Sequence, residues 1–218
     1  MKNNLIMNPD DKVIQIFPAP GLLTRYSGTI EEEFNYIQNL EYVPNGVSTA
    51  ADGWPHQTKD THLLRHKELF KIKDFIDESL NKFTNEIWKT KQTLIVTQSW
   101  CNKNLPGEEH AVHNHPNSII SGVFYFKQNE NLPPLQFVQM INCFYLPDIE
   151  EFNAFNSRMF SIPMNDGELI LFPSTLWHQV AKNRGRETRY SMSFNTFSNE
   201  LGTTEGLTEL KVQVQENQ

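Results

Sequence analysis

The chain has 218 residues and a net charge of −7, and 38% of its residues are hydrophobic, among them 15 Phe. This length is enough for one domain with a sizeable core, and the aromatic content excludes a disordered chain. The acidic balance disfavours nucleic acid as a partner, because binding to nucleic acid draws on cations that neutralise phosphates.

Targeting signals and cysteines indicate the compartment. The first 13 residues lack the apolar stretch of a signal peptide, and no run approaches the ~20 apolar residues that cross a bilayer. Cys101 and Cys143 stand far apart and form no C-x-x-C pattern, which favours two reduced thiols over a single disulfide. We therefore expect a soluble cytoplasmic protein that does not associate with membranes.

The first 91 residues predict a mixture of helix and loop. Residues 13–17 are typical of a short strand, and Thr29-Ile30-Glu31-Glu32 matches a capping box that would open a short helix. Residues 43–61, rich in Gly, Pro, Asp and Thr, indicate a loop. Apolar residues recur at steps of one, three or four over residues 65–88, which predicts an amphipathic helix packed on a flat surface.

Strand-like segments dominate after residue 91. They are rich in β-branched and aromatic residues, are separated by turn signals such as Pro106-Gly107 and Asn165-Asp166-Gly167, and cover residues 93–97, 119–126, 135–138, 168–172 and 190–197. Residues 201–209 indicate a loop, and residues 210–214 a last strand or a tail. Helices followed by many short strands indicate a mainly β member of the α+β class, a sandwich or jelly roll.

These patterns predict a single domain over residues 1–218. Residues 1–91 form a helical and loop support, residues 92–200 form the β core, and residues 201–218 form a C-terminal strand or tail.

Three histidines stand in a pattern that suits a metal. His113 and His115 are two residues apart, so in an extended segment both side chains point to the same face. His178 follows a different strand 63 residues later. Two ligands on one strand edge and a distant third leave one face of a metal open, as an oxygen-activating iron requires. The alternative is three unrelated histidines; His110 is a reserve candidate, and His56, His62 and His66 are expected at the surface.

The segment from Thr188 to Asn195 alternates strictly. Arg189, Ser191, Ser193 and Asn195 share one face of the predicted strand. The simplest interpretation is a half-exposed strand with its polar side in water. The functional one is a pocket wall, because a guanidinium grips a carboxylate through two hydrogen bonds and a serine two residues on adds a hydroxyl. Arg189 lies 11 residues after His178, a spacing that lets a hairpin return the chain beside the metal.

These motifs, with Ser121-Gly122-Val123-Phe124-Tyr125 and the segment from Gly167 to Ser174, resemble a known family. It is the group of 2-oxoglutarate- and iron(II)-dependent oxygenases found in bacteria and in phages of marine bacteria, with the prolyl hydroxylases as broader relatives. The resemblance covers residues 98–197. It implies a double-stranded β-helix, a cupin-like jelly roll with N-terminal helices packed on one side.

The resemblance also implies roles for particular residues. His113 and His178 would bind iron(II), and Arg189 with Ser191 would bind the distal carboxylate of 2-oxoglutarate. Tyr125 stands where prolyl hydroxylases place a tyrosine against that carboxylate, and Asn102 is a candidate for the pocket wall.

One position departs from the wider superfamily. Most relatives carry H-x-D, and here His115 takes the place of the aspartate. Three imidazoles leave more positive charge on the metal than two imidazoles and a carboxylate. The alternative is that Glu108, Glu109 or Asp166 completes the metal site.

The expected activity is an oxygenase, in particular a hydroxylase, that uses iron(II), 2-oxoglutarate and dioxygen. It would couple oxidative decarboxylation of 2-oxoglutarate to oxidation of a C–H bond. One alternative is a cupin-like three-histidine dioxygenase without 2-oxoglutarate; another is a structural jelly roll of a phage with a vestigial site. The substrate is not identified: a peptide or small metabolite fits better than nucleic acid. A homodimer is compatible with the sequence, and a phage-encoded chain would work in the host cytoplasm.

Overall fold

The computed structural model describes residues 12, 17–45, 55–140, 148–198, 200–201 and 210–211. Most of these residues belong to strands and the loops between them. The strands are β1 Leu22–Arg25, β2 Tyr42–Pro44, β3 His56–Thr58, β4 Leu94–Asn104, β5 His110–His113, β6 Ile120–Lys127, β7 Leu135–Val138, β8 Met159–Ile162, β9 Glu168–Pro173, β10 His178–Val180, β11 Arg189–Ser198, β12 Glu200–Leu201 and β13 Leu210–Lys211.

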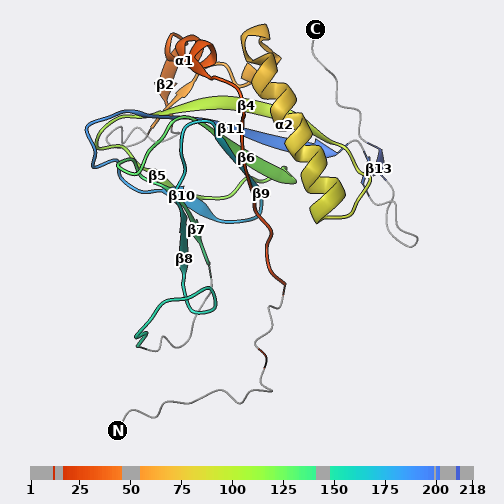
Figure 1. Ribbon diagram of the computed structural model, residues 1–218, viewed down its shortest axis with the longest axis vertical. Coiled ribbons are helices and arrows are strands. Elements are labelled where there is room, and N and C mark those ends of the chain that lie inside the picture. Colours follow the sequence, from red (N-terminus) through yellow and green to blue (C-terminus); the bar gives the residue numbers. More distant parts are fainter. Residues whose placement is uncertain are drawn as a thin grey trace.

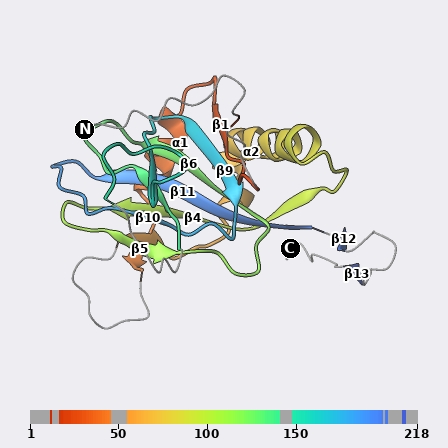
Figure 2. The same cartoon turned by 90° about the horizontal axis from the view of Figure 1, so that it is seen from below.

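Two antiparallel sheets make up the β layers (Figures 1 and 2). The larger sheet has seven strands in the order β1-β9-β6-β11-β4-β3-β2, and the smaller has four in the order β5-β10-β7-β8. β12 and β13 pair separately. At the centre of the larger sheet, β9, β6, β11 and β4 are neighbours although they are distant in the chain, as in a jelly roll.

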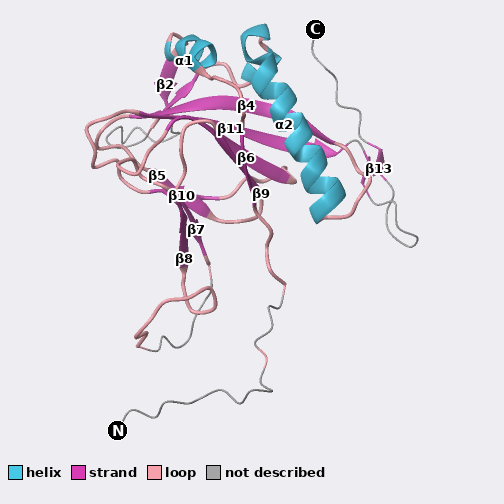
Figure 3. Ribbon diagram, viewed as in Figure 1, coloured by secondary structure: helices cyan, strands magenta, loops and turns pink. Residues whose placement is uncertain are grey.

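The helices cover one face of the larger sheet (Figure 3). They are α1 (Glu31–Gln38) and α2 (Phe70–Lys82), with short 3₁₀ turns at Leu63–Arg65 and Lys67–Leu69 before α2. Ile72, Ile76 and Leu80 of α2 are buried in one cluster with Phe124 and Met192 of the sheet. A second cluster lies between the two sheets and includes Val123, Tyr125, Leu135, Phe172 and Val180.

Alternate side chains of strand β11 point to opposite faces of the larger sheet. Tyr190, Met192 and Phe194 pack in the cluster under the helices, as strict alternation predicts. The polar residues on the opposite face are buried as well: Arg189 is 2% and Ser191 is 1% exposed. The interpretation of β11 as a half-exposed strand with its polar face in water is therefore wrong.

The architecture confirms the expected fold class. It is mainly β, with two antiparallel sheets and N-terminal helices on one outer side. The expected turn at Asn165-Asp166-Gly167 is present, and Gly167 takes a φ of 78°, which favours glycine. Within the described residues, no helix combines the length and apolarity needed to cross a membrane.

Several N-terminal expectations need correction. α1 begins at Glu31 after Ile30 and has no side-chain cap, so the predicted capping box does not form. The expected loop 43–61 contains β3 and most of β2, because β3 pairs with β4 and extends the larger sheet. The single helix expected over 65–88 is instead two 3₁₀ turns, α2, and a π-helical turn at Phe83–Ile87.

Two expected strands lie partly outside the described residues. These are residues 13–16 of the first strand and residues 212–214 of the last. Cys143 is outside the described residues too, whereas Cys101 is a buried free thiol.

Candidate metal centre

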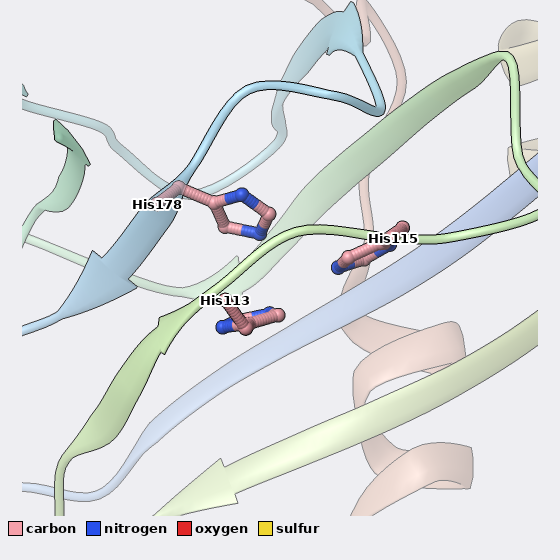
Figure 4. A group of neighbouring side chains, drawn as sticks. All are labelled: His113, His115 and His178. Carbon is pink, nitrogen blue, oxygen red and sulfur yellow. The ribbon is translucent and has the colours of Figure 1, made fainter. Parts of the chain in front are cut away.

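The structure brings His113, His115 and His178 together (Figure 4). His113 ends β5 and His178 begins β10, and the two lie opposite each other where these strands pair. His115 lies in the loop after β5, and its backbone N–H donates to the Ser174 carbonyl at 3.0 Å. The three imidazoles offer ligand atoms within 4.8 Å of one another. A site of three convergent nitrogen ligands suits a first-row metal ion.

Hydrogen bonds orient all three rings in the same sense. Nδ1 of His113 lies 2.7 Å from the Ala111 carbonyl oxygen, and Nδ1 of His178 lies 2.9 Å from the Leu176 carbonyl oxygen. Because a carbonyl only accepts, Nδ1 must carry the proton in both rings, and Nε2 keeps its lone pair. Nδ1 of His115 is held in the same way by the side-chain oxygen of Asn195. This outer shell is the arrangement that fixes imidazoles as metal ligands.

Burial keeps the three rings neutral. It is the largest cause that lowers the pKa of His113, His115 and His178, and the neighbouring imidazoles lower the pKa of His178 further, to about 3. Neutral imidazole is the form that binds metals, so the site needs no deprotonation near neutral pH.

The carboxylates considered as alternatives to His115 lie elsewhere. Glu108 accepts the Leu105 backbone N–H at 2.7 Å, Glu109 is exposed, and Asp166 accepts the Gln128 backbone N–H at 2.5 Å. No carboxylate of the described residues joins the histidine group. His110 stacks on His113, with ring centroids 4.7 Å apart, and is not part of the group either.

A buried guanidinium lies near the histidines. Arg189 donates from Nε to Gln128 Oε1 at 2.9 Å and from Nη1 to Asn104 Oδ1 at 3.2 Å and Ser191 Oγ at 3.0 Å. All three acceptors are neutral, and among the described residues no carboxylate pairs with Arg189. A buried charge without a counterion is costly, so this arrangement fits an anionic ligand.

A small cavity connects the two groups. Its lining includes His113, His115 and His178 together with Arg189, Ser191, Asn102 and Trp100. Its volume of about 20 Å³ is near that of one water molecule, so the lining side chains must move apart when a larger ligand binds.

Unpartnered donors surround this cavity and Arg189. The buried Nε1 of Trp100 and Nδ2 of Asn104 have no hydrogen-bond partner among the described residues. Buried polar atoms are usually paired, so these donors indicate an acceptor-bearing ligand. Iron and a dicarboxylate therefore both fit the residues present.

The other predicted pocket residues are near Arg189. The ring of Tyr125 lies with its centroid 5.1 Å from Arg189 Cζ, and Asn102 donates to Ser193 Oγ at 2.9 Å. Sequence reasoning missed Asn104 and Gln128, which hold the guanidinium. Asn104 could have been found, because it follows Asn102 by two residues on the same strand face. Gln128 follows β6 and carries no local signal.

Similar solved structures include 2-oxoglutarate-dependent enzymes. The epimerase SnoN from nogalamycin biosynthesis has a TM-score of 0.63 at 13% identity, with 90% of this chain and 91% of that chain covered. HygX from Streptomyces hygroscopicus, with nickel, 2-oxoglutarate and hygromycin B bound, has a TM-score of 0.58 at 13% identity, with 82% of each chain covered. A Pseudomonas putida prolyl-4-hydroxylase has a TM-score of 0.55 at 12% identity, with 81% of this chain and 92% of that chain covered.

The chain shares their jelly-roll fold, and in this chain the fold carries a group of three histidines and a buried arginine. No curated protein sequence matched this chain. Residues 98–195, which include every residue of the site just described, match the family model "Putative 2OG-Fe(II) oxygenase". This segment is therefore similar in sequence to the 2-oxoglutarate- and iron(II)-dependent oxygenases.

Proposed function

We propose that the chain is a hydroxylase in which His113, His115 and His178 hold iron(II) and Arg189 holds 2-oxoglutarate. The observation that carries the proposal is the buried Arg189 without a carboxylate partner among the described residues, in the same cavity as the three histidines. A guanidinium in this state binds a carboxylate strongly, because the desolvation cost is already met within the fold.

Different side chains of the cavity would bind the metal and the 2-oxoglutarate. The three Nε2 atoms would hold the metal, since Ala111, Leu176 and Asn195 engage each Nδ1. Arg189, Ser191 and the Tyr125 hydroxyl would receive the distal carboxylate of 2-oxoglutarate. When bound, iron(II) with 2-oxoglutarate and dioxygen supplies the oxidation: 2-oxoglutarate and dioxygen become succinate and carbon dioxide as one oxygen atom enters a substrate C–H bond.

Aromatic packing shields one side of the centre. The ring of Phe172, which is completely buried, lies 4.9 Å from the ring of His178, and Phe137 packs edge-on against Phe172 at 4.9 Å. These rings form an apolar wall behind His178, which strengthens polar interactions on that side of the site.

A three-histidine dioxygenase without a cosubstrate is the alternative. In such an enzyme Arg189 would have no anion to bind, and the unpartnered donors around it would have no acceptor. A vestigial structural jelly roll has no need for three imidazoles that each keep Nε2 free. Neither alternative accounts for the buried guanidinium.

The test is succinate formation from 2-oxoglutarate with iron(II) and dioxygen. The wild type and the Arg25→Gln variant, whose arginine is exposed on β1, should both form succinate. His178→Ala and Arg189→Gln should lose at least 90% of this rate. Wild-type rates in both variants would refute the assignment of the site.

Further properties remain predictions. Hygromycin B and nogalamycin RO in the structures of HygX and SnoN support a small-molecule substrate for this chain. The reduced thiol of Cys101 is compatible with a cytoplasmic location. A phage origin and a homodimer also stay predictions.

A further inference from the structure

One outer cleft opens directly on the histidine centre. It has a volume of about 410 Å³, within the range of small-molecule sites. It shares Trp100, His110, His113 and His115 with the inner cavity that ends at Arg189. Two larger cavities, each of about 530 Å³, include none of the three histidines of the centre. Of these cavities, the cleft is therefore the one that leads to the histidine centre.

Uncharged polar side chains make up a large part of the lining of the cleft. Its carboxamides are Asn45, Gln57, Gln98, Asn114 and Asn195. Thr61, Trp100 and the imidazoles add further polar groups, and among the described residues no aspartate, glutamate, lysine or arginine lines it.

Most of these carboxamides are free to bind a ligand. Asn195 is engaged by His115 and Ser121. For the side chains of the other four, the described residues provide no hydrogen-bond partner. Each carboxamide can donate and accept, so together they match a ligand that carries both kinds of group.

Trp100 adds an aromatic surface between the cleft and the inner cavity. Its ring packs near that of His115, with centroids 6.0 Å apart, and its buried Nε1–H has no acceptor among the described residues. A ligand near the metal could satisfy this donor, and its flat face could pack on the indole.

The cleft and the inner cavity differ in the charge of their lining. Arg189 gives the inner cavity a counterion for an anion, whereas the described lining of the cleft offers none to an anion or a cation. A charged substrate would lose hydration in the cleft without a compensating ion pair. A neutral polar substrate exchanges its water for carboxamides at little cost.

We propose that this oxygenase acts on an uncharged substrate whose amide or hydroxyl groups bind the carboxamides of this cleft beside Trp100. The proposal rests on the proposed function, because it takes the three histidines as the metal site. It excludes anionic metabolites and nucleic acid as the group that enters the cleft.

The test measures binding of matched probes to the full chain loaded with zinc(II) and 2-oxoglutarate. One trio is N-acetylalaninamide, N-acetylalanine and alaninamide, which are neutral, anionic and cationic. A second trio is glucose, glucuronate and glucosamine, which separates hydroxyl from amide recognition. The readout is the NMR signal of the Trp100 indole N–H, identified by its loss in Trp100→Phe.

The neutral member of at least one trio should shift the Trp100 signal saturably, and its charged partners should bind at least tenfold more weakly. A charged probe that binds as tightly as its neutral partner, or the absence of any shift, would overturn the proposal. Binding of 2-oxoglutarate is measured first in the same sample, and its failure would count against the proposed function instead.

A change of charge inside the cleft provides a second measurement. Gln98→Glu should raise the affinity for alaninamide or glucosamine several-fold relative to the neutral partner. Gln136→Glu places the same charge on β7, outside the lining of the cleft, and should leave the order of affinities as in the wild type. Equal effects of the two substitutions would contradict a role for the cleft.

Discussion

Arg189 lies opposite Asn104 where β11 pairs with β4, and its Nη1 donates a hydrogen bond of 3.2 Å to Asn104 Oδ1. Asn104 is completely buried, so the guanidinium meets a neutral oxygen at a place where a carboxylate would neutralise it. The positive charge of Arg189 therefore stays available to an anion in the inner cavity.

Asn104→Asp should place a competing carboxylate beside Arg189. We expect the affinity for 2-oxoglutarate to fall at least tenfold, while the thermal midpoint stays the same or rises because the buried charge gains a counterion. Calorimetric titration of the zinc-loaded protein measures the first quantity. Asn131→Asp, at an exposed position, makes the same change of charge and should bind as the wild type does. Unchanged affinity in Asn104→Asp would disprove the role of Arg189 as an anion anchor.

Asn195 should control metal affinity through His115. Asn195→Ala removes the oxygen that accepts from His115 Nδ1 and leaves Ser121 Oγ, 3.0 Å away, to orient the ring, so metal affinity should fall about 10- to 100-fold. Asn195→Asp keeps an acceptor and should retain most of the affinity. Competition with a chromogenic chelator gives the metal dissociation constants of both variants. Equal losses of metal affinity in the two variants would show that the acceptor at position 195 does not control metal binding.

The metal-free protein should lose stability in acid through His178. Its pKa in the fold is lowered to about 3, mainly by burial, whereas an unfolded chain titrates near 6.5. Below about pH 6.5 the unfolded state binds a proton that the folded state does not, so the free energy of unfolding falls with pH. From pH 7.5 to 5 the wild type should lose about 2 kcal/mol more than His178→Gln. Urea unfolding at the two pH values measures this, and parallel losses would contradict the shift.

Gly122 should be required by the packing of Phe194. A Cβ at position 122 would lie 2.1 Å from Cζ of the buried Phe194 ring. Gly122→Ala should therefore lower the free energy of unfolding by about 1–3 kcal/mol. Adding Phe194→Leu to Gly122→Ala should recover part of this loss, as a coupling between the two sites requires. Strictly additive effects in the double variant would argue against the contact.

Local patterns predicted the parts of the site that lie on single strands. Alternation along β11 placed Arg189 and Ser191 on one face, and the two-residue spacing of His113 and His115 placed their rings together. The same pattern could not decide whether the polar face of β11 meets water. That depends on the smaller sheet, which covers it through long-range pairing of β5, β7 and β10.

Other features depend on contacts that the sequence does not encode locally. The acceptors for His113 and His178 are backbone carbonyls, which every residue has. Gln128 accepts a hydrogen bond from Arg189, which is 61 residues away in the sequence. β3 has only three residues and forms because β4 offers a free edge. The capping box failed for a similar reason: the helix starts at Glu31 without the side-chain bond that Thr29 would supply.

Anaerobic titration of the iron(II)-loaded protein with 2-oxoglutarate tests the central claim most directly. The wild type and Arg25→Gln should develop a saturable charge-transfer absorbance. Arg189→Gln should require at least about 100-fold more 2-oxoglutarate, because it loses a charge-assisted anchor, and His178→Ala should show no such absorbance at any concentration. No absorbance in the wild type, or an undiminished one in Arg189→Gln, would contradict a site built from the three histidines and Arg189.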